Sequence, residues 1–390
     1  MMMCTCFMAC TPSEDVPGDT VPDTEKEEVK DTEKKEEKPK ETDPSKENTT
    51  KKEIDIYIIA GQSNGSGYTR MNVDELRVLW KNYNVGSPNV RYTGRAEYTN
   101  NVNTPDVSTG VNEYKTWVNA KMGQGKSSNH MGAEVGMAKV LSEEYYKTGT
   151  DNVAGIIKFA HGGTSLLNSL GGENAASGNW VSPSYAQEKN YTYSGLTGGL
   201  YRGLLKEVET KVDGLVSNGY KVNIKGLFWM QGESDRGNPA EYEKAFKHFV
   251  NDIRRDLGEI AGEDLSDLAI MIGEISRTSG SAVASTVATN EAFIEKQREL
   301  AKEIDNCYII ASGQYEINTL DANGNNTKDP YQNDNWHWNT REMFAIGELV
   351  GRCIIDNILN VSEAPETDNE SQEPTIGENG NEKDWTEKYY

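Results

Sequence analysis

The chain has 390 residues, of which 35% are hydrophobic, and a formal net charge of −22. This length and apolar content suffice for one large or two small folded domains, and the acidic balance without a basic run argues against a nucleic-acid partner. Residues 11–53 and 362–390 together carry −13 of the charge, which leaves a middle region of ordinary acidity.

The first ten residues resemble the end of a bacterial lipoprotein signal. Residues 1–9 are mostly apolar, Cys10 follows a small residue, and the chain then becomes polar. A full signal also has a basic start and a longer apolar core, which this segment lacks. Either Cys10 receives a lipid that anchors an extracytoplasmic protein at the bacterial surface or in the periplasm, or it belongs to an unstructured end of a secreted chain. We favour the lipid anchor, because a long polar tether follows.

Both ends of the chain have the composition of disordered segments. Residues 11–52 consist almost entirely of charged, Thr, Pro and Ser residues, and residues 362–390 form an acidic tail. Such segments bury too little apolar surface to offset the entropy of ordering. We therefore expect the folded domain to span 53–361. No apolar stretch approaches the roughly 20 residues that a membrane-spanning helix needs.

The middle of the chain alternates between strand and helix patterns. Apolar runs bounded by polar or Gly-containing segments predict buried strands, and periodic segments between them predict helices. Five such units predict a doubly wound α/β domain with a mainly parallel five-stranded sheet. The predicted strands are 54–60, 153–160, 224–230, 268–274 and 307–312, and the predicted helices are about 133–147, 197–217, 239–258, 288–304 and 340–358.

Three further local predictions accompany these elements. Asn339 and Glu342 form a capping-box pattern at the start of the last helix. Two long polar stretches, about 84–130 and 165–195, exceed ordinary connections and predict loops that build a substrate surface. Cys307 and Cys353 lie in apolar runs, where buried free thiols are expected, although a bridge between them stays open.

Polar motifs follow the predicted strands, where ligands bind in open parallel sheets. The first strand leads into Gly61-Gln62-Ser63-Asn64-Gly65, the second into His161-Gly162-Gly163-Thr164, and the third into Gln231-Gly232-Glu233-Ser234-Asp235. The motif Asp334-Asn335-Trp336-His337 precedes the last helix. The fold therefore predicts that these motifs gather along one edge of the sheet.

The pattern at this edge favours nucleophilic catalysis. Ser63, in a Gly-flanked turn after a buried strand, is a candidate nucleophile. A carboxylate three residues before His337 can orient one imidazole nitrogen and leave the other free to take a proton from the serine. Alternatively, Asp334 belongs to an Asn-rich surface loop with a cap. No Cys/His cluster suggests a metal site.

These motifs, with Gly132-Ala133-Glu134 between the first two, resemble in their order those of the SGNH/GDSL hydrolase superfamily. More narrowly they resemble the branch that contains sialate O-acetylesterases and the family 6 acetylxylan esterases. The resemblance covers about residues 54–358. It implies a flavodoxin-like three-layer α/β/α domain that needs no cofactor or metal.

The resemblance also implies a role for each site residue. Ser63 would be the nucleophile and His337 the general base, oriented by Asp334 or Glu233; we favour Asp334. The Ser63 N–H, the Gly163 N–H and the Gln231 side-chain amide would hold the oxyanion. The motif neighbours Gln62 and Asn64 complete the predicted oxyanion and substrate-binding set.

The expected reaction removes acetyl groups from a carbohydrate, either oligomeric or polymeric, through an acyl-enzyme. Acetylated xylan, O-acetylated sialic acid and acetylated pectin or mannan stay open as substrates. Two alternatives remain. A lipase-like or thioesterase member of the superfamily would need an apolar acyl channel, of which the motif loops give no sign. A non-catalytic carbohydrate-binding protein on an esterase scaffold would not require Ser63 and His337.

Overall fold

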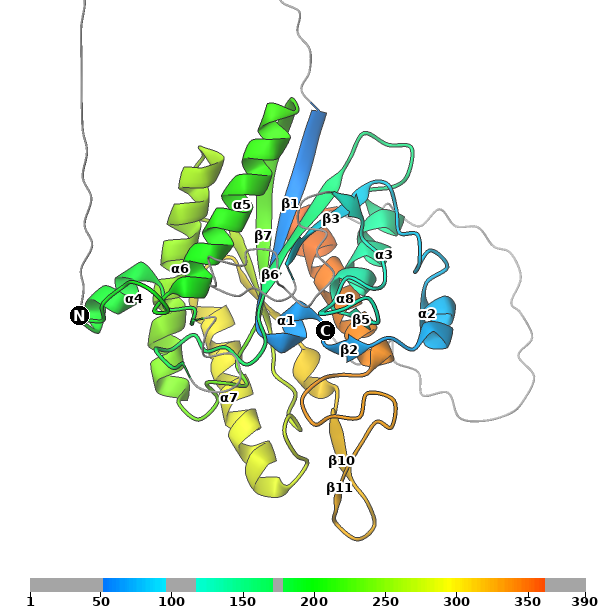
Figure 1. Ribbon diagram of the computed structural model, residues 1–390, viewed down its shortest axis with the longest axis vertical. Coiled ribbons are helices and arrows are strands. Elements are labelled where there is room, and N and C mark those ends of the chain that lie inside the picture. The colour runs from blue at the N-terminus through cyan, green and yellow to red at the C-terminus, as the bar shows by residue number, and fades with distance from the viewer. Residues whose placement is uncertain (1–51, 96–116, 171–177, 362–390) are drawn as a thin grey trace, which may run out of the picture. The chain divides into compact units, whose positions relative to one another are not determined.

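The computed structural model describes residues 52–95, 117–170 and 178–361. Among these, seven strands form a central sheet in the order β4-β3-β6-β1-β7-β8-β9 (Figure 1). Neighbouring strands are parallel except for β4, which is antiparallel to β3. The strands are β1 (Lys52–Gly61), β3 (Val90–Arg95), β4 (Val118–Asn119), β6 (Ala154–Ala160), β7 (Tyr220–Met230), β8 (Ala269–Gly273) and β9 (Cys307–Ile310).

The prediction of a mainly parallel sheet is confirmed, but the prediction of five strands is wrong. The five predicted strands are β1, β6, β7, β8 and β9, and the stretch 84–130, predicted as loop, adds β3 and β4. β3 lacks a continuous apolar run because Arg91 and Thr93 alternate with buried Val90 and Tyr92. Arg91 tolerates this position because its guanidinium donates to Asn119 Oδ1 and Trp117 O, both at 2.7 Å.

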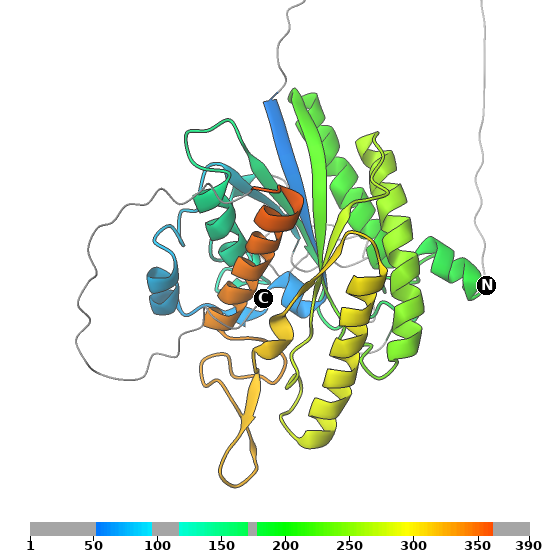
Figure 2. The ribbon, with the colours of Figure 1, turned by 180° about the vertical axis from the view of Figure 1, so that it is seen from behind.

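Helices cover both faces of the sheet, so the domain has three layers (Figures 1 and 2). One face carries α5 (Gly199–Ser217), α6 (Pro239–Ala261) and α7 (Ala284–Glu303), and the other carries α3 (Glu134–Glu144) and α8 (Thr340–Cys353). β1 shows why both faces are filled. Ile56 and Ile58 belong to the core under α5 and α6, whereas Tyr57 and Ile59 belong to the core under α3 and α8. Successive side chains of a strand point to opposite faces, and here both sets are apolar.

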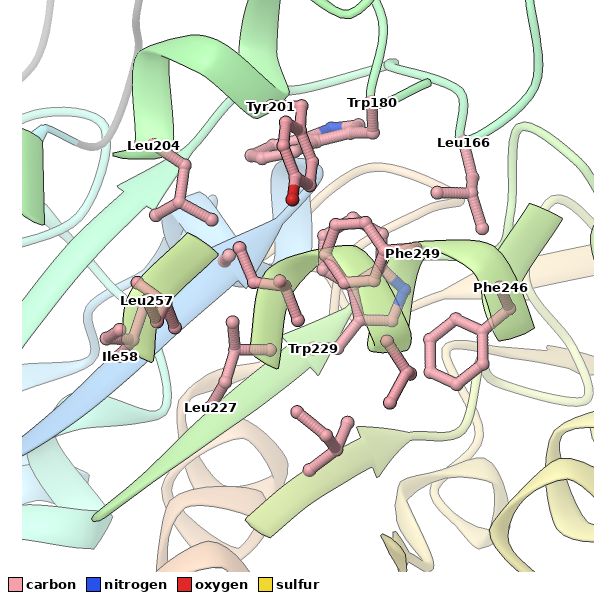
Figure 3. Packing of buried hydrophobic residues seen from close by; sticks show 14 of the residues in the cluster. Ile58, Leu166, Trp180, Tyr201, Leu204, Leu227, Trp229, Phe246, Phe249 and Leu257 are labelled. Atoms are coloured by element: carbon pink, nitrogen blue, oxygen red, sulfur yellow. The ribbon is translucent and has the colours of Figure 1, made fainter. Parts of the chain in front are cut away.

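Aromatic rings fill the larger of the two cores (Figure 3). Trp180 and Trp229 meet edge to face with their ring centroids 5.1 Å apart, and Tyr201 meets Phe249 in the same way at 5.9 Å. Such pairs add about 0.5–1.5 kcal/mol beyond the burial of their area. Trp180 lies in the polar stretch 165–195, so part of that stretch packs into the core and does not form a substrate loop.

Shorter elements lie around the carboxyl edge of the sheet. They are α1 (Ser63–Ser66), α2 (Val73–Leu79), α4 (Pro183–Glu188), the paired strands β2 (Thr69–Arg70) and β5 (His130–Met131), the paired strands β10 (Asn318–Leu320) and β11 (Asn326–Lys328), and the single turn Ser312–Gln314. A further turn, Ile354–Ile358, continues the far end of α8. The capping box at Asn339 and Glu342 is confirmed, since each side chain accepts from the other residue's backbone N–H. No helix in the described ranges has the length and apolar character needed to cross a membrane.

Two groups of predictions concern other parts of the chain. The predictions for residues 1–10, 11–51 and 362–390, including the lipid anchor at Cys10, fall outside the described residues and stay predictions. Cys307 is buried, Cys353 is partly buried, and both thiols are free, as expected. Burial raises the pKa of each to about 12, so neither is a reactive thiolate.

Candidate active site

The turn after β1 sets the position of Ser63. Gly61 has φ +134°, and a Cβ there would lie 2.1 Å from Met230 O, so the close approach of β1 to β7 requires glycine. Gln62 N–H then donates to Met230 O at 2.9 Å, and Ser63 begins α1 with 8% of its surface exposed. As the first residue of the helix, Ser63 has no intrahelical acceptor for its own N–H.

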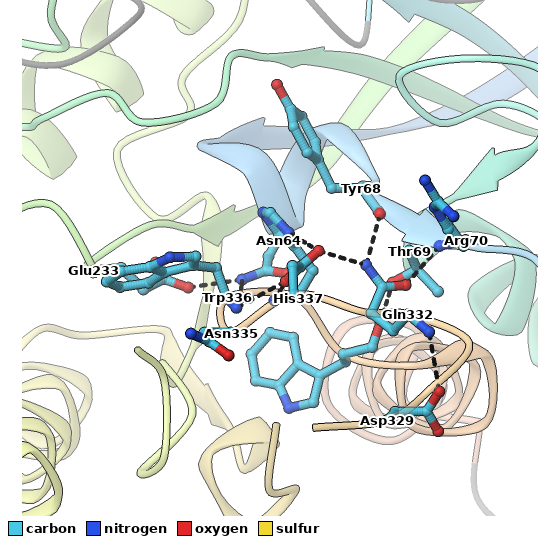
Figure 4. Close-up of polar contacts among 12 residues, drawn as sticks. Asn64, Tyr68, Thr69, Arg70, Glu233, Asp329, Gln332, Asn335, Trp336 and His337 are labelled. Carbon is cyan, nitrogen blue, oxygen red and sulfur yellow. Dashed lines mark hydrogen bonds and ion pairs between the residues drawn. The ribbon is translucent and has the colours of Figure 1, made fainter. Parts of the chain in front are cut away.

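His337 and Asp334 lie in the loop before α8, and Figure 4 shows His337 among its neighbours. His337 Nδ1 is 2.9 Å from Asp334 Oδ2, and Asp334 Oδ1 accepts the backbone N–H groups of Trp336 and His337 at 2.8 and 2.9 Å. Burial alone would raise the pKa of Asp334, but the hydrogen bond and charge of His337 outweigh it, and the pKa falls to about 2. The carboxylate is therefore ionised at neutral pH and holds the imidazole by Nδ1.

Two contacts join the Ser63 segment to the His337 loop. Asn64 Nδ2 donates to Trp336 O at 3.2 Å, so the residue after the serine bonds the residue before the histidine. The ring of Tyr68 stacks on His337 with a centroid separation of 4.8 Å and an interplanar angle of 28°. Segments more than 260 residues apart thus form one site, as the sheet order predicts.

The structure separates the two candidate acids. Asp334 contacts His337 Nδ1, whereas Glu233 Oε1 accepts from Asn64 Nδ2 at 2.7 Å (Figure 4). Burial raises the pKa of Glu233, although the Asn64 hydrogen bond and the nearby charge of His337 lower it in part. In this arrangement the carboxylate of Asp334 bonds the imidazole, and that of Glu233 bonds the Asn64 side chain.

The predicted oxyanion donors differ in availability. Gly163 has φ +67° and is exposed, and its N–H has no acceptor among the described residues. Gln231 differs from the prediction, because its Nε2 already donates to Asp235 Oδ2 at 2.6 Å and to Thr164 O at 3.2 Å. Both amide hydrogens are therefore used to hold the loop next to Gly163. Gln62 is likewise a support, since its Oε1 accepts from Ser234 N at 3.4 Å.

Gln332 is a site residue that the sequence analysis missed. It is 4% exposed, and its Nε2 donates to Asp334 Oδ2 at 2.9 Å and to Tyr68 O at 3.1 Å. Its Oε1 accepts from Arg70 N at 2.7 Å. The side chain thus ties Asp334 to the segment that follows α1 (Figure 4). No pattern in the sequence distinguishes this glutamine from the other polar residues of its loop.

A fully buried ion pair lies next to α1, the short helix that begins at Ser63. Lys158 Nζ is 2.6 Å from Glu134 Oε2, and both side chains have no exposed surface. The ammonium also donates to Gln124 O at 3.1 Å and to Ser66 O, the last carbonyl of α1, at 3.3 Å. Through this ion pair, Glu134 of the Gly132-Ala133-Glu134 motif supports the backbone of α1.

A second serine–histidine–carboxylate row lies on α4 and α6. Ser184 Oγ is 2.7 Å from His248 Nδ1, and His248 Nε2 is 2.7 Å from Glu188 Oε2. However, the Ser184 hydroxyl donates to Asp252 Oδ2 at 2.8 Å, so its hydrogen points away from the imidazole. A general base must receive that hydrogen, and this row therefore serves as a natural control for the Ser63 site.

The two tryptophans that flank His337 have different surroundings. Trp338 is fully buried and its Nε1 donates to Tyr315 O at 2.9 Å, so it anchors the loop to the core. Trp336, the residue before His337, is 43% exposed. Of the other histidines, His161 directly follows β6 and is buried, and its N–H donates to Gly61 O at 3.0 Å, which fits a support role.

A family model described as "Carbohydrate esterase, sialic acid-specific acetylesterase" matches residues 53–356. No curated protein matches the chain at a significant level.

Three solved structures illustrate the similarity. A protein from Arabidopsis thaliana has a TM-score of 0.44 and 17% identity over 78% of this chain and 98% of its own. NanS has a TM-score of 0.48 and 15% identity over 80% and 98% of the two chains. A carbohydrate acetylesterase from Xanthomonas citri has a TM-score of 0.46 and 13% identity over 78% of this chain and 56% of its own.

Proposed function

Because the chain belongs to the carbohydrate esterase, sialic acid-specific acetylesterase family, it is a carboxylic ester hydrolase, and we propose that it releases acetate from O-acetylated sugars through an acyl-enzyme on Ser63. The observation that carries the proposal is the row of contacts from Asp334 through His337 to the Ser63 segment. We also propose that the chain belongs to the branch of the SGNH/GDSL superfamily that contains sialate O-acetylesterases and the family 6 acetylxylan esterases. The order of the motifs along the chain supports this assignment.

In the proposed reaction the Ser63 oxygen attacks the acetyl carbonyl while His337 Nε2 accepts the hydroxyl proton. Asp334 fixes the imidazole by Nδ1 and stabilises its charged form. The proton then passes to the departing sugar oxygen. Water, deprotonated by His337, attacks the acetyl-serine, and acetate leaves as Ser63 recovers its proton.

The oxyanion would be held by backbone amides. The N–H of Ser63 is free of the helix ladder, and the N–H of Gly163 lacks an acceptor in the described part of the chain. The side chain of Gln231 supports this arrangement through its bond to Thr164 O. Such preorganised donors stabilise the tetrahedral intermediate most strongly where water is excluded.

The decisive experiment measures acetate release by the purified chain from a small activated acetate ester, acetylated xylan, acetylated pectin or mannan, and O-acetylated sialic acid. Ser63→Ala should abolish release from every substrate that the parent hydrolyses. Ser184→Ala is the matched control, because Ser184 has a hydrogen-bonded histidine but lies outside the site, and it should retain release. Loss of activity in Ser184→Ala but not in Ser63→Ala would reverse the assignment.

A second pair of variants tests the orienting acid. Asp334→Asn preserves size but offers His337 Nδ1 an amide, which favours the wrong tautomer and should lower kcat by about 10³- to 10⁴-fold. Glu233→Gln preserves the acceptor for Asn64 and should have a much smaller effect. Equal losses in the two variants would contradict the proposed division between Asp334 and Glu233.

We extend the proposal to domain limits and location. Residues 53–361 are proposed to form the catalytic domain, flanked by the linker 11–52 and the tail 362–390, with Cys10 as a lipid anchor outside the cytoplasm. Labelling of the chain in bacteria with a fatty acid, lost in Cys10→Ala, would support the anchor. Labelling that persists in this variant would refute it.

A further inference from the structure

Arg236 places a positive charge next to the candidate active site. It lies in the turn between β7 and α6, three residues after Glu233. Its guanidinium carbon is 5.0 Å from the ring centroid of Trp336, the exposed tryptophan that adjoins His337. The arginine therefore lies against the side chain of the residue that directly precedes the site histidine.

This charge has no counter-ion among the described residues. None of the ion pairs formed by the described residues includes Arg236, and its Nη1 is buried without a hydrogen-bond partner. The side chain is half-buried, and desolvation lowers the pKa of its guanidinium below the ordinary value. By contrast, the buried Arg254 donates to Leu268 O at 3.0 Å and to Asp305 O at 2.6 Å. A partly desolvated cation without acceptors is costly, and an arriving anion would offset that cost.

Glu233 does not supply the missing partner. Its charge acts on Arg236, but its Oε1 is engaged by Asn64 Nδ2 at 2.7 Å. Burial also raises the pKa of Glu233. The guanidinium is therefore left for a ligand.

Trp336 is held in place although it is exposed. Gly280 has φ +85°, and a Cβ there would lie 3.0 Å from Trp336 Cη2, so the backbone abuts the indole ring. Gly280 N–H also donates to Asn335 O at 2.7 Å, which ties down the preceding residue. An aromatic side chain held next to a cation can bind a sugar ring that packs its apolar face on the indole and places an anionic group near the guanidinium.

We propose that Arg236 and Trp336 form a subsite for the carboxylate-bearing sugar of the substrate, so that the enzyme acts on O-acetylated acidic sugars in preference to neutral ones. This inference rests on the proposed acetylesterase function of Ser63. The guanidinium binds the carboxylate, which it can match with paired hydrogen bonds, and Trp336 supports the ring. Sialic acids and uronic acids share this chemistry, and the substrates of the test distinguish them.

The test compares kcat/KM of the full chain on O-acetylated sialic acid, acetylated oligogalacturonide and acetylated xylo-oligosaccharide without uronic acid. Arg236→Gln should reduce the ratio of acidic to neutral kcat/KM by about 10- to 100-fold, mainly through KM, as expected for a lost hydrogen bond to a charged group. Arg236→Lys should restore part of the ratio. Arg70→Gln removes an exposed arginine of the neighbouring β2 and should leave the ratio as in the parent.

The outcomes separate this inference from the proposed function. The acidic sugar whose hydrolysis depends on Arg236 identifies the source of the carboxylate. Three results would overturn the inference while acetylesterase activity stands. In Arg236→Gln, the ratio of acidic to neutral kcat/KM could be unchanged, or kcat/KM could fall equally on acidic and neutral substrates. The parent could also prefer the neutral substrate. Failure of the parent to hydrolyse even a small activated acetate ester would instead refute the proposed function. Thermal unfolding of each variant checks its fold.

A binding measurement gives a readout independent of turnover. Free N-acetylneuraminic acid and galacturonic acid should compete with the small activated ester in the parent, and one of them should lose at least about 10-fold in inhibition constant in Arg236→Gln. Equal inhibition of parent and variant by both acids would contradict the subsite.

Discussion

The buried pair of Lys158 and Glu134 offers the sharpest test of how the fold supports the segment that carries Ser63. Lys158→Met replaces the ammonium with an uncharged side chain of similar length. The Glu134 carboxylate then keeps only the backbone N–H of Gly132, at 2.9 Å. The carbonyls of Gln124 and Ser66 lose a donor in a region that excludes water.

The expected cost follows from this geometry. Removing one partner of a buried pair leaves an uncompensated charge, which typically costs about 3–5 kcal/mol. Burial lowers the pKa of Lys158 despite the attraction of Glu134, so the pair is held at an energetic cost that a neutral double variant avoids. Lys158→Met/Glu134→Gln should therefore lose less free energy of unfolding than the sum of the two single variants.

Urea unfolding of the parent, both single variants and the double variant measures these values. Because Ser66 ends the helix that Ser63 begins, Lys158→Met should also lower kcat on a small activated ester. A loss below about 1 kcal/mol in Lys158→Met, or strict additivity in the double variant, would refute the reasoning. Lys139→Met is the control, since its ion pairs with Glu143 and Glu348 are partly exposed and should contribute at most about 1 kcal/mol.

Three further predictions concern the same edge of the sheet. Burial lowers the pKa of His130 to about 4, and the charges of Lys126 and Arg70 act in the same direction. The free energy of unfolding should therefore fall by about 3 kcal/mol as the pH drops from above 6.5 to 4, because the unfolded chain takes up this proton first. In His130→Gln, urea unfolding should show a smaller change over this pH range. Gln332→Leu removes a donor to Asp334 and should lower kcat about 10-fold with little change in KM, whereas a change in KM alone would point to substrate binding. Gly61→Ala should cost at least about 1–3 kcal/mol from backbone strain, measured by thermal unfolding, and an unchanged midpoint would contradict the close approach to Met230.

Local chemistry made much of the fold predictable. The continuous apolar runs of β1, β6, β7, β8 and β9 and the helical periodicity between them required no tertiary information. The capping box at Asn339 likewise depends on residues three apart. β3 escaped prediction because its polar residues become tolerable only when β4 and the neighbouring loop supply partners, as they do for Arg91.

The residues that surround the candidate site show the opposite behaviour. Gln332 bonds Arg70 N across 262 positions, and Asn64 bonds Trp336 O across 272. Nothing near Gln332 or Arg236 in the sequence indicates such partners. The unused charge of Arg236 is likewise visible only when its surroundings are known.

The sequence by itself determined the strands, the helices and the motifs at the strand ends, because these depend on side-chain periodicity and on turn residues close together in the chain. Only the tertiary structure decided which carboxylate contacts His337, that Gln231 holds a loop, and that Lys158 and Glu134 form a buried pair beneath Ser63. A hydrogen bond depends on distances of a few tenths of an ångström. Such distances are fixed by packing of the whole sheet and not by any local segment.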